Sequence, residues 1–540
     1  MVGKVGTNLR AAAARWEREA ALLLTAVVFS AVQGATPNII GIDAYYHIKV
    51  AALMLEQGPR LDFPWLQLTI LGPGRYSDHH FLFHLLQAPF TMIDLRIAAK
   101  LAAVLFATLG LFSCYAFFAH QGIRYPLLWL GALLACSPHF LWRQSMARPQ
   151  ALSLALLVAA IWVVVYGRPR LLVLIGFLAA WLFDGFPLVV GVPAAALAAQ
   201  IALWLVARFR RDRSEATTAA RGDGGCCPPS PRTALAAVGW ATLGVALGVL
   251  THPYVPNNIE FAYLHLAPKT VLGGEAEVRV GGEWYPYSRA GFLTHAAPAT
   301  ALTLLGLVPP LLALLRGRLP DWRTLTLGAL GLGFLVMVIR SQRIIEYFPA
   351  FAVLFCAWSW SHTPLEWGDR VSGVLARVPP VVRRPLGWWP LLVGGMIALA
   401  LVSTTMQARR SAGSGRAWTA YREPALWLAA NTPPGARVFN TDWDDFTHLF
   451  FWNTHNVYLV GLDPTYMSLY DPELFNLWRR VSSGQVAAPS KTIRETFGAE
   501  YVFSDLRHTS FLRAAAADPA IEEVARNGNA VVLRVRDGAR

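Results

Sequence analysis

Charged residues are scarce in this 540-residue sequence: Asp, Glu, Lys and Arg make up only 15%, whereas hydrophobic residues make up 55%. About a quarter of the residues of a soluble domain are usually charged, and the mean hydropathy here is +0.40. Most of the chain is therefore expected to lie in a membrane. The net charge is +14, but no basic face interleaved with aromatic residues is present, which argues against nucleic-acid binding.

Cysteine is also scarce, and its spacing argues against two kinds of site. Three cysteines lie within apolar runs and two are adjacent in a basic loop. They are Cys114, Cys136 and Cys356, and Cys226 and Cys227. Neither a disulfide framework nor a zinc site has this spacing. Redox and metal–thiolate chemistry are therefore not expected.

Long apolar runs are the most prominent feature of the sequence. The run after Arg18 lacks a small-residue cleavage site, so we predict a first transmembrane helix ending near residue 35 rather than a removable signal. With it, about eleven transmembrane helices are expected. The other ten cover 97–119, 126–138, 151–166, 171–183, 187–207, 234–250, 291–315, 324–339, 345–361 and 387–405. Residues 1–405 thus form a polytopic all-α membrane domain.

The basic residues predict the orientation of this domain. Several lie within residues 1–18, which the positive-inside rule places in the cytoplasm. Alternating crossings then leave the first loop, 37–96, and the C-terminus outside. The loop at 208–232 is expected to be a disordered cytoplasmic connector. Abundant Ala and the excess of Arg over Lys suggest a high-GC bacterium, so the plasma membrane is the expected location.

The composition changes near residue 406, where long apolar runs give way to short mixed segments. Residues 406–540 are therefore predicted to form a soluble α/β domain on the outer face. A helix is expected over 421–430. Strands are expected over 437–440, 457–460, 501–503 and 530–535.

The first external loop, 37–96, carries polar residues beside the membrane. Asp43 and His47 are four residues apart, so they share a face if 43–57 is helical. Asp43 could cap that helix, or it could act as a general base or metal ligand, since charged groups this close to lipid are functional candidates. An inverting sugar transfer needs one carboxylate to deprotonate or orient the acceptor.

A second polar cluster in the same loop consists of Asp78, His79 and His80, with His84 one turn later. A carboxylate with imidazoles can bind a divalent cation such as Mn²⁺ or Zn²⁺. With Asp43, these residues form a candidate metal site, for which Mn²⁺ or Mg²⁺ is the expected cofactor. The alternative is a polar turn that caps a helix over 81–93.

The run Asp43-Ala44-Tyr45-Tyr46-His47 resembles the Asp-x-Tyr-Tyr-His of archaeal and bacterial oligosaccharyltransferase catalytic subunits. More broadly, the plan of the chain resembles the GT-C superfamily of membrane glycosyltransferases that use lipid-linked sugars. The resemblance implies that Asp43 is the leading catalytic or metal-binding carboxylate, assisted by His47 and Asp78. It does not decide metal dependence, because the superfamily has members of both kinds.

Two arginines near the outer end of a late helix are candidates for the lipid phosphate. A late arginine contacts this phosphate in oligosaccharyltransferases, and Arg340 or Arg343 resembles it. Guanidinium groups bind phosphate in a bidentate manner. The alternatives are pairing with Glu346 and snorkelling to the interface.

The chain also departs from the oligosaccharyltransferase pattern. The loop around Arg143 and Arg148 lacks the second acidic pair of those enzymes, although Asp184 could substitute for it. Trp443-Asp444-Asp445 matches only part of their Trp-Trp-Asp-Tyr-Gly acceptor motif. These three residues, Trp443, Asp444 and Asp445, are tentative acceptor-binding residues, and recognition of an Asn-x-Ser/Thr sequon is not supported.

Two further segments are left open by the sequence. The Gly-rich, aromatic and acidic loop at 251–290 suits either a mobile lid or a plain connector. The turn at 460–466 suits either a ligand-binding junction or a structural turn.

We therefore predict a membrane glycosyltransferase that transfers a sugar or glycan from a polyprenyl-phosphate-linked donor on the non-cytoplasmic side. The acceptor would be a glycan, a lipid or a protein. An oligosaccharyltransferase acting on protein is one alternative. A transporter or flippase for lipid-linked sugars is another, but it would predict ionisable residues within several spans, whereas here they gather in one outer loop.

Overall fold

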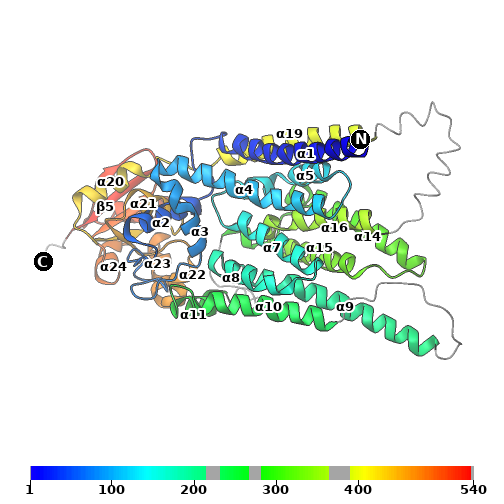
Figure 1. Cartoon of the computed structure of the whole chain (residues 1–540). Coiled ribbons are helices and arrows are strands. Elements are labelled where there is room, and N and C mark those ends of the chain that lie inside the picture. Colours follow the sequence, from blue (N-terminus) through cyan, green and yellow to red (C-terminus); the bar gives the residue numbers. More distant parts are fainter. Residues whose placement is uncertain (1, 215–230, 267–280, 364–388, 537–540) are drawn as a thin grey trace.

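The computed structural model describes residues 2–214, 231–266, 281–363 and 389–536. A bundle of roughly parallel and antiparallel helices makes up most of the molecule (Figure 1). At one end of the bundle, the first external loop and the C-terminal domain lie together. The N-terminus lies at the opposite end, so the polar clusters of the loop are far from it.

Most bundle helices coincide with the predicted spans, but the helix at 138–144 was not predicted, and the predicted span 291–315 is divided between two helices. The bundle helices are α1 (Val2–Gln33), α4 (Leu95–His120), α5 (Pro126–Ala135), α6 (Pro138–Gln144), α7 (Gln150–Val165), α8 (Leu172–Leu182), α9 (Pro187–Ser214), α10 (Pro231–Leu250), α13 (Arg289–His295), α14 (Ala297–Leu315), α15 (Trp322–Arg340), α16 (Phe348–His362) and α19 (Trp389–Gly413). Within the described residues, six helices are long and apolar enough to cross a membrane: α4, α9, α10, α14, α15 and α19. The other predicted spans correspond to shorter helices or to α1, so the count of eleven stays a prediction.

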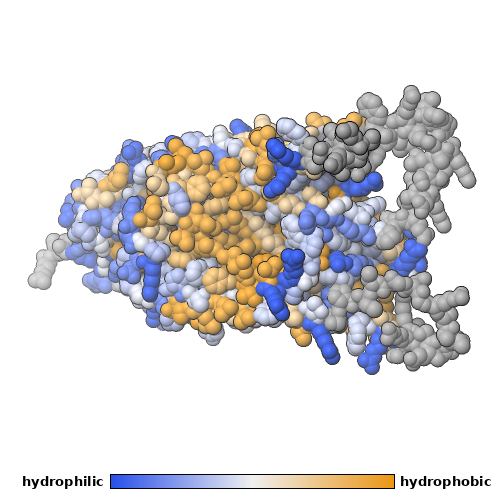
Figure 2. Space-filling view, in the orientation of Figure 1, coloured by the Kyte–Doolittle hydropathy of each residue, from blue (hydrophilic) through white to orange (hydrophobic). Residues whose placement is uncertain are grey.

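Apolar side chains cover the middle of the bundle on the face that Figure 2 shows. In Figure 2 they form a band on the visible face, and both ends of the molecule are more hydrophilic. Inside the bundle, α8 and α10 approach closely because Gly176, Gly244 and Gly248 face backbone atoms of the other helix, where a Cβ would clash. Small residues at helix contacts are typical of membrane bundles, where close backbone packing stabilises helix pairs.

The C-terminal domain contains a five-stranded mixed sheet in the order β2-β1-β3-β5-β4. Its strands are β1 (Arg437–Asn440), β2 (Val457–Tyr458), β3 (Tyr501–Asp505), β4 (Ile521–Arg526) and β5 (Ala530–Val535), with β1 parallel to β2 and β3 and the others antiparallel. Its helices are α20 (Arg422–Asn431), α21 (Phe446–Trp452), α22 (Thr465–Tyr470), α23 (Pro472–Ser482), α24 (Pro489–Glu495) and α25 (Thr509–Ala516). All four predicted strands are present, and β4 was not predicted.

The first external loop packs directly against this domain. It contains α2 (Asp43–Gln57), α3 (Phe81–Gln87) and the 3₁₀ helix η1 (Ala88–Met92). Leu66 forms a parallel bridge with Tyr458 of the edge strand β2, and Tyr458 N–H donates to the Trp65 carbonyl at 2.8 Å. Phe63 of the loop and Phe450 of α21 belong to one buried apolar cluster. The loop and the domain therefore share a hydrophobic core.

Several shorter elements complete the fold. They are α11 (Asn257–Phe261), the π-helical turn η3 (Ala262–Leu266), and the 3₁₀ helices η2 (Pro169–Leu171), η4 (Gly282–Trp284) and η5 (Gln342–Glu346). The loop predicted at 251–290 is thus partly helical, but its central residues 267–280, which bear on the choice between lid and connector, lie outside the described residues. Most of the predicted connector at 208–232 also lies outside them.

Candidate functional site

A cavity of about 580 Å³ lies between the start of α2, the ends of the bundle helices and the C-terminal domain. Asp43 lines this cavity and also a smaller one of about 80 Å³, which reaches His47, His79 and His80. The prediction that Asp43 and His47 share a face of one helix is confirmed, since both line the smaller cavity. Asp43 is therefore one of two carboxylates, with Asp463, that line both cavities.

Asp43 is held by an arginine rather than by a capping contact. It is the first residue of α2, the capping position belongs to Ile42, and no side chain caps this end. The capping alternative is thus wrong. Arg148 Nη2 lies 2.8 Å from Asp43 Oδ2, and within the described part of the chain the second oxygen, Oδ1, makes no hydrogen bond. A carboxylate at a helix N-terminus is also stabilised by the helix dipole.

Three arginines at the end of the bundle that faces the C-terminal domain surround one carboxylate; we call Arg143, Arg148 and Arg343 the arginine triad. Glu283 Oε1 lies 2.7 Å from Arg343 Nη1, and Glu283 Oε2 lies 2.7 Å from Arg143 Nη2 and 3.7 Å from Arg148 Nη1. Burial acts to raise the pKa of Glu283, but the three guanidiniums hold it far below its usual value. Glu283 is therefore ionised across the physiological range.

Two further carboxylates balance the arginine triad. Glu346 Oε1 lies 2.5 Å from Arg143 Nη2 and 3.9 Å from Arg148 Nη1, and Asp43 pairs with Arg148. The proposed pairing of Glu346 with Arg340 or Arg343 is therefore wrong, because Glu346 binds Arg143 instead. Three guanidiniums thus face three carboxylates, and such a network is stable only when every charge is paired.

The two candidate phosphate-binding arginines differ in position. Arg343 lines the smaller cavity and stacks on Trp284, with its guanidinium carbon 4.7 Å from the ring centroid. Arg340 is exposed at the end of α15 and lines neither of the two cavities. Asp184 lines the smaller cavity, as expected of a substitute for the missing second acid. Of the two arginines, Arg343 is placed to meet a ligand near Asp43.

The second polar cluster forms a buried hydrogen-bonded relay. His84 Nδ1 lies 2.7 Å from Asp78 Oδ2, and His84 Nε2 lies 2.8 Å from His47 Nδ1. Burial tends to raise the pKa of Asp78, but His84 holds it below its usual value, so the carboxylate accepts from His84. In the tautomer that carries its proton on Nδ1, His84 accepts from His47 Nδ1–H at Nε2, and the His47 Nε2 lone pair is then left for the cavity. The relay fixes the tautomer and orientation of His47.

The residues present do not fit the expected metal site. Among the described residues, no three acidic, histidine or cysteine side chains come together closely enough to hold an ion. Asp78 is buried, with one oxygen on His84 and the other on the backbone N–H of His80, and Asp43 pairs with Arg148. A divalent cation would also lie beside guanidinium groups, which repel it. The site formed by Asp43, Asp78, His79 and His80 therefore stays a prediction from the sequence alone.

The tentative acceptor residues lie on the domain side of the larger cavity. Trp443 and Asp444 line it, together with Arg416. Asp445 is buried behind them, where it accepts hydrogen bonds from Tyr421 Oη at 2.6 Å and Arg416 Nη1 at 3.1 Å. Asp444 and Trp443 are thus placed to meet a ligand, whereas Asp445 supports the cavity wall.

The burial of Asp445 predicts how the stability of the protein depends on pH. Burial, and then the Asp444 carboxylate, raise the pKa of Asp445 to about 8. A carboxyl whose pKa is higher in the folded state contributes stability that is complete below pH ~4 and is lost as the pH rises through 8. Between pH 5 and 8 the wild-type unfolding free energy should fall by up to about 1.4 kcal/mol per pH unit more than that of Asp445→Asn. Thermal unfolding at each pH measures this difference.

The control for this prediction is Glu500→Gln, an exposed carboxylate of the same domain. It should keep the wild-type pH dependence. Equal pH dependence of wild type and Asp445→Asn would contradict the prediction.

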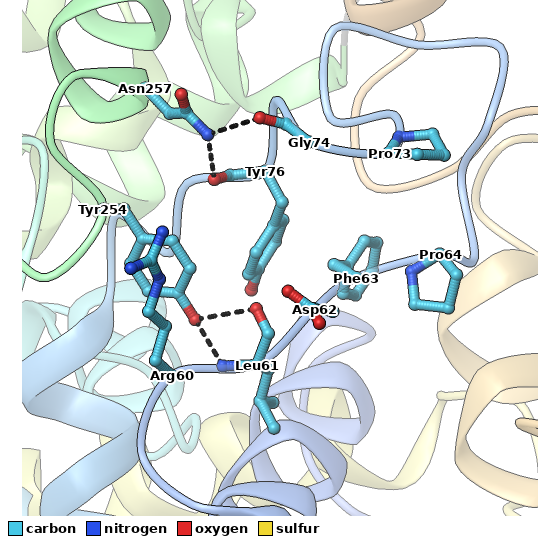
Figure 3. A pocket seen from close by; sticks show the side chains of 10 residues that line it. All are labelled: Arg60, Leu61, Asp62, Phe63, Pro64, Pro73, Gly74, Tyr76, Tyr254 and Asn257. Carbon is cyan, nitrogen blue, oxygen red and sulfur yellow. Dashed lines mark hydrogen bonds between the residues drawn. The ribbon is translucent and has the colours of Figure 1, made fainter.

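A third cavity, of about 220 Å³, is lined by residues of the first external loop and of the segment after α10 (Figure 3). The Tyr254 phenol accepts from the Leu61 N–H at 2.8 Å and donates to its carbonyl at 3.2 Å. Asn257 donates to the Tyr76 carbonyl at 3.1 Å, and the Tyr76 phenol bonds the phenol of Tyr46 at 3.0 Å. Since Tyr46 lines the smaller cavity, the segment after α10 braces one wall of the candidate site.

Sequence reasoning named Glu346 only as a partner of Arg340 or Arg343, and it did not connect Glu346 or Glu283 with Arg143. Arg143 was noted only as part of a loop without acids, yet Glu346 is 203 residues away in sequence and Glu283 is 140 away. Their pairing could have been suspected, because Arg143, Glu283 and Glu346 all lie near predicted outer helix ends, where buried charges need partners. Asp463, in the turn left open at 460–466, also lines both main cavities.

Comparison with known proteins finds similarity in structure but not in sequence. No protein-family model matches the chain, and no curated protein matches it. The archaeal oligosaccharyltransferase AglB from Archaeoglobus fulgidus, in complex with an inhibitory peptide and a dolichol-phosphate, is similar over 93% of this chain and 71% of its own, with a TM-score of 0.60 and 13% identity. ArnT from Cupriavidus metallidurans, bound to undecaprenyl phosphate, is similar over 95% of this chain and 97% of its own, with a TM-score of 0.51 and 14% identity.

The fold is that of the GT-C glycosyltransferases. The likeness in fold extends over nearly the whole chain, as the resemblance in overall plan implied. ArnT from the same bacterium in the apo state is similar over 97% of this chain, with a TM-score of 0.53 and 15% identity. At these identities the likeness to GT-C structures concerns the fold, and it leaves the chemistry of the site to its own residues.

Proposed function

We propose that this protein is an integral membrane glycosyltransferase that uses a polyprenyl-phosphate-linked sugar on the non-cytoplasmic face. The observation that carries the proposal is the position of Asp43 in one cavity, between Arg143 and Arg148 of the arginine triad on the bundle side and Trp443 and Asp444 on the domain side. Arginines suit a phosphate, and a carboxylate suits an acceptor hydroxyl. Solved GT-C structures bound to undecaprenyl phosphate and dolichol-phosphate support a donor of this class.

The proposed reaction is a single displacement at the anomeric carbon. Asp43 accepts the proton of the acceptor hydroxyl, whose oxygen forms the new bond to that carbon. The bond between the anomeric carbon and the phosphate oxygen breaks, and the phosphate leaves with the electron pair. The arginine triad stabilises the negative charge that develops on the phosphate. His47 positions the acceptor side through its Nε2 lone pair.

Turnover of purified protein tests the proposal. Wild-type protein in detergent is supplied with polyprenyl-phospho-sugars and, in separate tubes, with glycan, lipid and Asn-x-Thr peptide acceptors, each with and without EDTA. Transfer to any acceptor supports the enzyme, and the EDTA tubes decide metal dependence. Transfer to the peptide would favour the oligosaccharyltransferase alternative, although the acceptor motif is incomplete. Absence of transfer from every donor, with flipping of lipid-linked sugar in vesicles, would favour the transporter alternative instead.

A further inference from the structure

Glu283 occupies a position whose chemistry suits a phosphate better than a side-chain carboxylate. Both of its oxygens lie 2.7 Å from guanidinium nitrogens, Oε1 from Arg343 and Oε2 from Arg143, and Arg148 is 3.7 Å away. Three converging guanidiniums are a typical environment for a phosphate group, which presents more acceptor oxygens than a carboxylate. The Glu283 carboxylate therefore occupies the position that a phosphate group would take.

The surrounding contacts let the Glu283 side chain leave while its backbone stays in place. Ser341 Oγ donates to the Glu283 carbonyl at 3.1 Å, and Gln342 N–H donates to the Tyr285 carbonyl at 3.0 Å. These bonds hold the segment to η5. The Glu283 side chain is nevertheless 23% exposed, whereas that of Glu346 is 2% exposed. Glu346 is therefore expected to stay paired with the arginine triad, whereas another anion can replace the Glu283 side chain.

The arginine triad would keep its shape after Glu283 left. Arg143 would still bind Glu346 at 2.5 Å, and Arg148 would still bind Asp43 at 2.8 Å. Arg343 would stay on the face of Trp284, since a guanidinium over an aromatic ring is stabilised without a counter-ion. Two carboxylates would then face three guanidiniums. The triad would carry one net positive charge, which one monoanion neutralises.

We propose that the phosphate of the sugar donor displaces Glu283 from the arginine triad, one anion for one, and that the donor carries its sugar on a single phosphodiester. A phosphodiester has one negative charge, so this exchange leaves the triad neutral. A diphosphate would bring a further charge without a further guanidinium of the triad to meet it. The inference rests on the proposed function, because it assumes a lipid-linked sugar as ligand.

Calorimetric titration with two probes tests the displacement. The probes are the glucose phosphodiester of farnesol and its diphosphate counterpart, titrated into detergent-purified wild type, Glu283→Gln and Glu283→Asp. We expect Glu283→Gln to bind the phosphodiester at least tenfold more tightly than wild type, because the competing carboxylate is gone. Glu283→Asp should show a smaller gain, since a shorter side chain cannot reach Arg143 and Arg343 together. Glu260→Gln, an exposed residue of α11, is the matched control and should bind like wild type.

The outcomes separate this inference from the proposed function. Equal or weaker binding of the phosphodiester by a folded Glu283→Gln would overturn the displacement and leave the glycosyltransferase standing. Tenfold tighter binding of the diphosphate than of the phosphodiester by wild type would overturn the single-phosphate donor. Failure of every variant to bind either probe would remove the donor site, and with it both proposals.

Discussion

Substitution of Asp43 by asparagine is expected to lower the turnover number roughly a thousandfold, within the range that a general base contributes. An amide cannot accept the proton of the acceptor hydroxyl, and it removes the negative charge that orients the hydroxyl. Arg148 would still lie 3.7 Å from Glu283 and 3.9 Å from Glu346, so the variant should fold. The measurement is single-turnover transfer from a polyprenyl-phospho-sugar, with thermal unfolding alongside.

The matched control is Glu56→Gln, which changes an exposed carboxylate in the last turn of the same helix α2. It should keep wild-type turnover. If Asp43→Asn also kept wild-type turnover, Asp43 would not be the base. Asp184, which lines the smaller cavity, would then be the next carboxylate to replace.

Substitution of Arg143 by alanine is expected to cost the protein about 3–5 kcal/mol of stability, the usual effect of breaking a buried ion pair. Glu346 is 1% exposed, and without Arg143 its nearest guanidinium would be Arg148 at 3.9 Å. A buried carboxylate left in this state has lost its solvation without regaining a close partner. Chemical or thermal unfolding in detergent measures the loss.

Two variants distinguish a lost charge pair from a general defect. Arg340→Ala removes an exposed arginine at the end of α15 and should change stability by less than about 0.5 kcal/mol. The double variant Arg143→Met, Glu346→Leu removes both charges and should recover most of the lost stability, because an apolar pair of similar volume often replaces a buried ion pair without penalty. A double variant as unstable as Arg143→Ala would show that the pair is not the cause.

Local patterns predicted most of the elements. The strands at 437–440 and 530–535 are β1 and β5 with the same bounds, because each is a short buried apolar run between turns. The strand β4 escaped notice because Ile521–Arg526 is half-exposed at the sheet edge and carries two glutamates. An edge strand can carry charges that a central strand cannot. The sequence of β4 therefore has the polar pattern that is typical of a loop.

The candidate site was predictable only where its residues share one element. Asp43 and His47 meet because helical spacing brings them together. The position of Asp78 behind His84, away from the cavity, depends on how α3 packs against α2, and no sequence period encodes that. The same holds for Arg143 and Glu346, whose pairing spans 203 residues. Long-range charge pairs follow from tertiary packing, so the sequence shows the charges but not their partners.

The bridge between Leu66 and Tyr458 pairs the first external loop with the edge strand β2 of the C-terminal domain. Phe63 and Phe450 add a common apolar core. A chimera in which only residues 406–540 are replaced by the domain of a related protein would therefore lack the loop segment that pairs with the edge strand of that domain. We therefore expect that acceptor preference can be transferred to another protein only when the Asp43 loop and the C-terminal domain are transferred together.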